Sequence, residues 1–253
     1  MIGIALSGGG ARGISHLGVL KALNEHGITS DIISGTSAGA IVGGFYCAGY
    51  SPDDILSILI KTKMLAIFKP AFSWKGLLSM DRLNSILQDN LPNTFDKLNK
   101  PLLIAATNIE AGKTTYFNTG ELHSAILASS CLPVLFNPIE IEGVKYIDGG
   151  ILNNLPVEAL LKKASTIVAV GCNPIVEKHA FNSFKDVLER SSLLAINENT
   201  SQSKQLADLF IEPPALSNFS GFDLSKAKEI FETGYEYTSQ NIVNFAQKLN
   251  LSI

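Results

Sequence analysis

The sequence has few charged residues and no long hydrophobic run. Charged residues make up 17% of the chain and hydrophobic residues 46%, against roughly 25% charged in an average soluble protein. This composition excludes extended disorder, and a net charge of −3 gives no broad basic surface for nucleic acid. No apolar run reaches the roughly 20 residues that a membrane-spanning helix needs. We therefore expect a folded chain that has no spanning helix and does not bind nucleic acid.

Cysteine is also scarce. Cys47, Cys131 and Cys172 are an odd number at wide spacing, which excludes a disulfide framework and a zinc-ligand pattern. Three buried, reduced thiols are typical of a cytoplasmic protein. The apolar run at 2–6 is too short for a secretion signal and continues into a glycine loop. We expect this run to be the first core strand, with no leader before it.

Short apolar runs alternate with helical patterns along the chain, and this order predicts a three-layer α/β fold. A mostly parallel central sheet would then carry helices on both faces. The whole chain, 1–253, is expected to form a single domain with a helical C-terminal part from about residue 180. The strands are predicted at 2–6, 32–34, 101–109, 144–147, 166–171 and 209–211, with 113–118 as the hairpin partner of 101–109. The helices are predicted at 14–26, up to Gly49 after Ser37, from Pro52 behind a Ser51 N-cap, and at 121–130, 184–206 and 224–249.

A glycine loop, Gly8-Gly9-Gly10-Ala11-Arg12-Gly13, follows the first predicted strand and matches G-x-G-x-x-G. A dinucleotide site would need an acid at the end of the second strand, but that strand ends in Gly35-Thr36-Ser37. The Lys-Ser/Thr ending of a phosphate-binding loop is also absent. These absences disfavour a nucleotide site, and the other two interpretations are a tight turn and a set of backbone N–H groups that can hold an oxyanion.

The run Gly35-Thr36-Ser37-Ala38-Gly39 fits the nucleophile motif G-x-S-x-G. The motif requires a strand before the serine and a helix after it, and the predicted elements supply both. Small neighbours allow the sharp turn that exposes the serine. A chance match in a glycine-rich chain is the alternative. The context favours Ser37 as a nucleophile.

A serine nucleophile needs a group that takes its proton. In a triad ordered Ser, acid, His, only a late histidine could serve, and among His16, His26, His123 and His179 only His179 is late. Asp148, at the end of a predicted strand, is the better candidate. The alternative is a plain Asp-Gly turn, but the polar run from Asp148 to Pro156 is unusually specific for one.

The three motifs, in this order, resemble those of the patatin-like phospholipase family, and the chain is most similar to its compact bacterial members. The similarity runs from residue 2 to about residue 175 and includes the stretches 128–133 and 153–156. The resemblance implies a Ser37–Asp148 dyad without histidine, and no metal or cofactor. It implies an oxyanion hole made by the N–H groups of Gly8, Gly9 and Gly10. It also places Arg12 near a substrate phosphate, which a planar guanidinium suits; a structural ion pair is the alternative.

The expected function is a serine acyl hydrolase that cleaves acyl esters of phospholipids or related lipids through an acyl-enzyme. A thioesterase or small-ester hydrolase is the alternative among enzymes. A non-catalytic nucleotide-binding or adaptor protein on the same fold is the alternative outside them. Every motif position is filled, which favours an enzyme.

Residues 64–78 are unusually apolar for a connection and include Phe68, Phe72 and Trp74 between lysines. One hypothesis is a lid that contacts a lipid surface transiently. The other is buried packing between helices, because an exposed apolar patch of this size needs a function. With the first hypothesis, the protein would be cytoplasmic and peripheral at a membrane surface.

Overall fold

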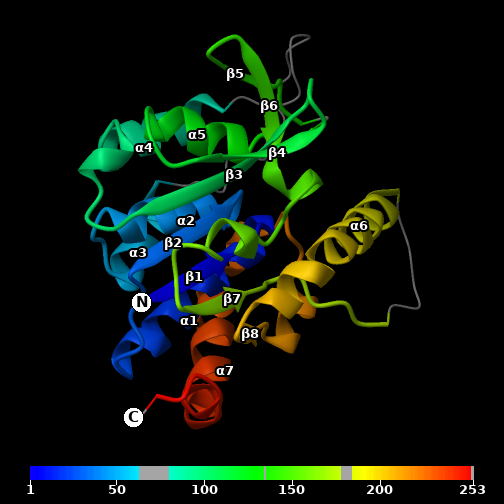
Figure 1. The fold of residues 1–253 in the computed structure, drawn as a ribbon. Coiled ribbons are helices and arrows are strands. Elements are labelled where there is room, and N and C mark those ends of the chain that lie inside the picture. Colours follow the sequence, from blue (N-terminus) through cyan, green and yellow to red (C-terminus); the bar gives the residue numbers. More distant parts are fainter. Residues whose placement is uncertain (63–79, 134, 178–183, 252–253) are drawn as a thin grey trace.

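The structure is a computed structural model, and it describes residues 1–62, 80–133, 135–177 and 184–251. Within these residues, eight strands form one mixed, mostly parallel sheet in the order β5-β6-β3-β2-β1-β7-β8, with β4 also paired to β3 (Figure 1). Strands β1, β2, β3, β7 and β8 pair in parallel, and β4, β5 and β6 are antiparallel to their neighbours. The strands are β1 (Ile2–Leu6), β2 (Ile32–Thr36), β3 (Leu102–Asn108), β4 (Lys113–Phe117), β5 (Ile139–Ile141), β6 (Val144–Asp148), β7 (Thr166–Val170) and β8 (Leu209–Ile211).

Seven α-helices lie within the described residues. Ser51 caps helix α3 as predicted, since its Oγ accepts a hydrogen bond from the N–H of Asp54 at 3.2 Å. The glycine loop enters a 3-10 helix, η1, and Asp148 is followed by another, η4. The helices are α1 (Ser15–Glu25), α2 (Ala38–Cys47), α3 (Pro52–Lys61), α4 (Asp81–Asn90), α5 (Leu122–Ser129), α6 (Phe184–Leu206) and α7 (Ala227–Lys248), with η1 (Gly10–Ile14) and η4 (Gly149–Ile151).

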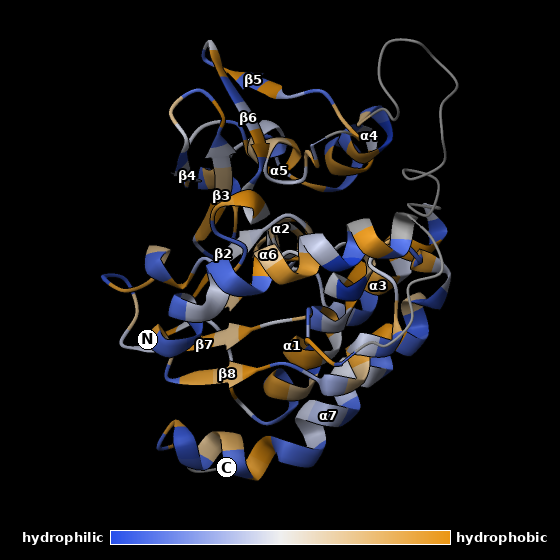
Figure 2. Ribbon diagram, turned by 90° about the vertical axis from the view of Figure 1, so that its right-hand side faces the viewer, coloured by the Kyte–Doolittle hydropathy of each residue, from blue (hydrophilic) through white to orange (hydrophobic). Residues whose placement is uncertain are grey.

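Strands β2, β3 and β7 are buried along most of their length. Successive residues of a strand point to opposite faces of the sheet, and each face is covered by a hydrophobic core. Ile33 packs into the larger core with α1, α2 and α7, while its neighbour Ile32 packs into a smaller core on the other face. That second core includes Leu160, and Phe210 of β8 and Ala207, which follows α6, pack against it. Strands β7 and β8 are accordingly coloured mainly as hydrophobic in Figure 2. The predicted three-layer α/β fold is confirmed.

The sheet brings three loops to one edge. β1 and β2 are parallel neighbours, so the glycine loop and Ser37 follow strands that end side by side. β6 runs antiparallel to β3, with Asp148 opposite Ala106, and Ala105 pairs with Thr36. Asp148 therefore lies at the level of Thr36 and Ser37 although its own strand runs the other way.

Candidate active site

Ser37 occupies a strained turn between β2 and α2. Its φ of 53° and ψ of −118° are rare for any residue with a side chain. A Cβ at Gly35 would overlap the carbonyl oxygen of Gly39, so the small residues of the motif are required by close backbone packing. The N–H of Ser37 donates to Ser129 Oγ at 2.8 Å, and Ser129 Oγ donates to the carbonyl of Ala105 at 2.6 Å. Helix α5 thus holds the turn, a contribution that the motif alone did not indicate.

Asp148 is buried beside this turn. Its Oδ1 accepts a hydrogen bond from the N–H of Gly150 at 2.7 Å, and Oδ2 has no partner of ordinary hydrogen-bond geometry among the described residues. Burial raises the pKa of Asp148 to about 6, while the nearby Ser37 hydroxyl and the Gly150 N–H act to lower it. Catalytic hydrogen bonds are often long until substrate binds. The site therefore holds a carboxyl whose pKa lies close to neutrality next to a serine hydroxyl.

The three glycines predicted for an oxyanion hole differ in their hydrogen bonding. The N–H of Gly8 donates to the carbonyl of Asn154 at 3.0 Å, so this amide is already occupied and Gly8 is not a free donor. The N–H groups of Gly9 and Gly10 have no partner in the described part of the chain. Gly10 has a φ of 58° and lines the same pocket as Ser37. Two of the three predicted amides are thus available to an oxyanion.

Arg12 is buried and paired with other parts of the chain. It is 5% exposed and forms a salt bridge to Glu189 of α6 at 2.9 Å. Its Nε also donates to the carbonyl of Phe219 at 2.7 Å, and it does not line the pocket at Ser37. These contacts show the structural ion pair that was the alternative, and a role of Arg12 near a substrate phosphate stays a prediction.

No described histidine contacts Ser37. His16 Nε2 pairs with the carbonyl oxygen of Ser7 at 2.8 Å, and burial lowers the pKa of His16 to about 4. His26 caps the end of α1 through the carbonyl of Ala22, and His123 pairs with the carbonyl of Leu91. His179 lies outside the described residues. Asp148 is therefore the titratable group that the described structure places beside Ser37.

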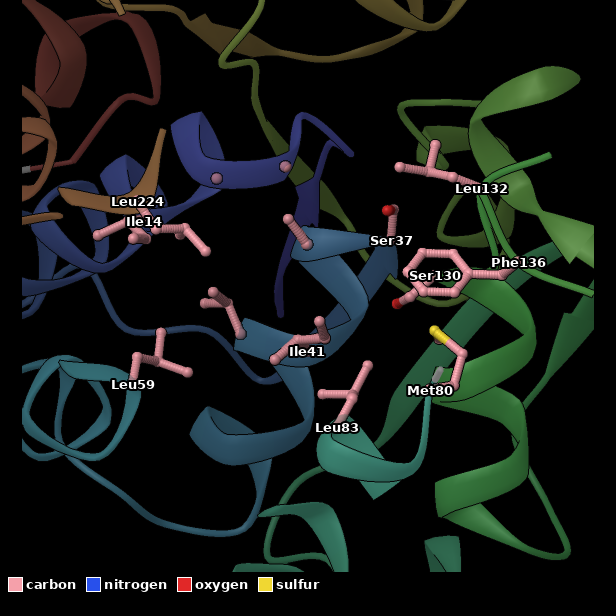
Figure 3. A pocket seen from close by; sticks show the side chains of 14 residues that line it. Ile14, Ser37, Ile41, Leu59, Met80, Leu83, Ser130, Leu132, Phe136 and Leu224 are labelled. Carbon is pink, nitrogen blue, oxygen red and sulfur yellow. The ribbon is translucent and has the colours of Figure 1, made fainter. Parts of the chain in front are cut away.

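The pocket at Ser37 is apolar. Fourteen of the described residues line it, and among these Ser37 and Ser130 contribute a side-chain hydroxyl (Figure 3). Sequence motifs did not indicate most of the lining, which comes from α2, α3, α4 and the loop after α5. Its apolar members include Ile14, Ile41, Val42, Leu59, Met80, Leu83, Leu132, Phe136 and Leu224.

The remaining predictions concern a lid, a membrane-spanning helix and a metal site. The candidate lid at 64–78 lies outside the described residues. Among the residues that are described, no helix is long and apolar enough to cross a bilayer, and no group of three or more His, Cys, Asp or Glu could hold a metal ion.

Comparisons with known proteins identify the family of this chain. The family model for patatin-like phospholipase matches residues 4–161. An uncharacterized NTE family protein of Mycobacterium tuberculosis is 35% identical over 176 residues, which cover 68% of this chain and 49% of that protein. Lysophospholipase NTE1 of Scheffersomyces stipitis is 29% identical over 283 aligned positions, covering 94% of this chain and 18% of that protein. This chain thus spans about half the length of its mycobacterial relative.

Among solved structures, VipD from Legionella pneumophila is similar to this chain. The match has a TM-score of 0.52 and 16% identity, and it covers 96% of this chain and 66% of VipD. At that identity it supports the fold. The family match spans more than half of the chain and contains Ser37, Asp148 and the glycine loop: the chain belongs to the patatin-like phospholipase family.

Proposed function

We propose that this chain is a lipid acyl hydrolase that uses Ser37 as nucleophile and Asp148 as general base. The observation that carries the proposal is the pairing of a strained, pocket-lining Ser37 with a buried carboxyl whose pKa burial raises to about 6. A base with a pKa near the working pH combines a useful ionised fraction with a useful driving force for proton transfer. The family supports a hydrolase, and one relative is named a lysophospholipase.

The reaction would proceed in two steps. Ser37 Oγ attacks the ester carbonyl carbon while Asp148 takes the hydroxyl proton, and the proton then passes to the departing alcohol oxygen as the carbon–oxygen bond breaks. Asp148 next takes a proton from water as the water oxygen attacks the acyl carbon, and it returns that proton to Ser37 Oγ as the bond to the acyl group breaks and the carboxylic acid leaves. The N–H groups of Gly9 and Gly10 would stabilise the oxyanion in both steps, and one such donor is typically worth about 10²–10³ in rate.

The apolar pocket favours an acyl chain as the part of the substrate beside Ser37. An apolar lining with a few polar groups at the reacting atoms is typical of ligand pockets. We therefore propose carboxylic esters of phospholipids or related lipids as substrates, with no cofactor. We also propose that the whole chain forms one patatin-like domain. The C-terminal strand β8 belongs to the same sheet as β1, and the C-terminal helix α7 packs on α1.

Labelling with a fluorophosphonate probe tests the nucleophile. The wild-type chain should become covalently labelled, and Ser37→Ala should lose both labelling and turnover while keeping its thermal unfolding temperature. Ser130→Ala, which removes the other hydroxyl of the pocket, should still be labelled. Full labelling of Ser37→Ala would refute the assignment. Lysophospholipid, diacyl phospholipid and an acyl thioester, tested in parallel, separate a lipid esterase from a thioesterase.

Transient contact with a lipid surface is part of the proposal and rests on the sequence of residues 64–78. Trp74 is the only tryptophan, so tryptophan fluorescence reports on this stretch. Phospholipid vesicles should shift its emission to shorter wavelength, and Trp74→Ala should impair hydrolysis of vesicles more than that of a soluble ester. An unchanged emission, with equal loss on both substrates, would favour buried packing.

A further inference from the structure

The carbonyl oxygen of Gly8 is the acceptor for three buried side chains. Asn173 Nδ2 lies 2.6 Å from it, Asn154 Nδ2 lies at 3.1 Å and Cys172 Sγ at 3.4 Å. The three residues are 4%, 2% and 0% exposed. A backbone carbonyl has two lone pairs, so these donors saturate it and fix its direction toward the interior.

Fixing this carbonyl also fixes the N–H of Gly9. The peptide unit is planar and trans, so the carbonyl of Gly8 and the N–H of Gly9 lie on opposite edges of it. The N–H of Gly9 therefore points away from the two asparagine side chains, and it has no partner among the described residues. A Cβ built on Gly8 would lie 3.1 Å from Cβ of Ser37, so this peptide lies against the nucleophile.

Asn154 contacts Gly8 on two sides. Its side-chain amide donates to the Gly8 carbonyl, and its backbone carbonyl accepts from the Gly8 N–H at 3.0 Å. Its own N–H is paired with Asn199 Oδ1 of α6 at 3.3 Å. Asn154 follows Asp148 by six residues, so it ties the glycine loop directly to the segment that carries the proposed base.

Asn173 is held by the C-terminal part of the chain. Its N–H donates to Glu212 Oε1 at 3.3 Å, and its carbonyl accepts from Asn197 Nδ2 of α6 at 2.8 Å. Its side-chain Oδ1 lies 3.5 Å from Arg12 Nη1, which leaves Nδ2 directed at Gly8. The backbone of Asn173 is therefore held by contacts that lie outside the three motifs, and Arg12 orients its side-chain amide.

We propose that Asn154 and Asn173 are positioning residues that hold the Gly8–Gly9 peptide with its N–H toward the developing oxyanion. The inference rests on the proposed function. Donors at the carbonyl edge resist a flip of the peptide, which would place an oxygen where the transition state needs a donor. They also polarise the peptide, because hydrogen bonds in a chain strengthen one another. A neutral amide does this without adding a charge beside Asp148.

The test compares Asn154→Ala, Asn173→Ala and the double variant on a soluble substrate, p-nitrophenyl butyrate. The double variant should lose roughly 10²–10³-fold in kcat, the cost of one oxyanion donor, with KM little changed, because the interaction is made in the transition state. An alkyl trifluoromethyl ketone, whose adduct with serine carries an oxyanion, provides the second measurement. Its inhibition constant should rise in proportion to the loss of kcat/KM.

A merely structural role would lower the unfolding temperature without changing ketone affinity. Asn241→Ala is the matched control, since it removes an amide-to-carbonyl hydrogen bond within α7, from Nδ2 to the carbonyl of Tyr237 at 2.8 Å, and it should leave kcat and ketone affinity unchanged. If the alanine variants do not fold, Asn154→Asp and Asn173→Asp keep the side-chain volume and replace the donor by an acceptor. A folded double variant with unchanged ketone affinity overturns the inference. A wild-type chain that neither hydrolyses the ester nor binds the ketone overturns the proposed function and the inference with it.

Discussion

At the scale of single residues, the candidate site is built from groups held in unfavourable states. Ser37 has a positive φ that a residue with a side chain rarely adopts, and Asp148 is a carboxyl buried with one oxygen unpartnered among the described residues. Each costs free energy of folding, and such costs are concentrated at functional sites. The cost at Asp148 can be measured, because its carboxyl titrates and its effect on the free energy of unfolding therefore changes with pH.

The first prediction concerns the pH dependence of activity. Only the carboxylate can accept a proton from Ser37, and burial raises the pKa of Asp148 to about 6. We expect kcat/KM on a soluble ester to fall below an apparent pKa near 6 and to level off above it. The measurement is a pH–rate profile of the free enzyme.

An apparent pKa near 6 would also fit a histidine, so the group needs to be identified. A solvent of lower polarity disfavours the charged form of either group. It should therefore raise the apparent pKa if a carboxyl titrates and lower it if an imidazolium does. A downward shift with added dimethylformamide would contradict the assignment to Asp148.

The second prediction concerns stability. The folded-state pKa of Asp148 is about 6, above the ordinary value of 3.8, so ionising this carboxyl disfavours folding as the pH rises between the two values. A difference of about two pH units corresponds to about 3 kcal/mol. Asp148→Asn should therefore be inactive yet more stable than wild type at pH 8, with the gain disappearing by about pH 4. Urea unfolding at both pH values measures this, and a variant less stable than wild type at pH 8 would count against it.

At the scale of elements, helices α1 and α7 pack closely through a pair of glycines. A Cβ on Gly18 would overlap the carbonyl oxygen of Phe231, and a Cβ on Gly234 would overlap that of Ser15. Both glycines lie inside helices, where glycine costs roughly 1 kcal/mol relative to alanine. The close approach of the two helices accounts for their presence.

The third prediction follows from this contact. By helix propensity alone, Gly18→Ala would be stabilising. We expect it to lower the free energy of unfolding by about 1–3 kcal/mol, because an added methyl group must push the two backbones apart. Thermal unfolding measures the change. Val243→Ala on the exposed side of α7, where Val243 is 60% exposed, is the control and should have little effect.

Some helices and strands were predicted from the sequence, and others were not. The long apolar runs of β1 and β3, the capped start of α3 and the hairpin of β3 with β4 were all predicted. Helix α4 and strand β5 were missed. β5 has only three residues, and α4 buries only Leu83, Ile86 and Leu87. β5 is too short to show a pattern, and α4 lacks the side-chain N-cap that marks the start of α3.

At the scale of the whole molecule, the C-terminal part of the chain holds the N-terminal glycine loop. Ala11 N–H donates to the carbonyl of Gly221 at 2.8 Å, and Glu189 accepts from Gly221 N–H and from Arg12. The region after residue 175, in which no motif was found, therefore supports the loop that is proposed to form the oxyanion hole.

The fourth prediction is that the Arg12–Glu189 ion pair stabilises the fold by linking the glycine loop to helix α6. Removing one partner of a buried pair leaves an uncompensated charge and typically costs about 3–5 kcal/mol. Arg12→Met should cost toward the lower end of this range, because the side chain of Glu189 is 19% exposed. Adding Glu189→Gln should recover part of the loss, since the second charge is then gone.

A double-mutant cycle by urea unfolding measures this coupling. Kinetics add a second criterion, because Arg12→Met should impair a small ester without a phosphate as much as it impairs a phospholipid. A loss confined to phospholipids would restore the role near a substrate phosphate.

The sequence by itself determined the α/β class, the nucleophile turn and the candidate Ser37 and Asp148. These features are local: strand–turn–helix geometry needs glycine and small residues at fixed spacing, and neighbouring parallel strands bring their C-terminal loops together. An Asp-Gly pair alone is common in turns, so Asp148 was identified from its place at a strand end and from the polar run that follows it.

The tertiary structure alone decided which groups are available at the site. It paired the N–H of Gly8 with Asn154 and Arg12 with Glu189. It also brought Ser129 and the apolar lining to Ser37, and Asn173 to the carbonyl of Gly8. The physical reason is that a hydrogen-bond donor is free or occupied according to partners more than a hundred residues away. Burial, which sets the pKa of Asp148, likewise depends on the packing of several elements at once.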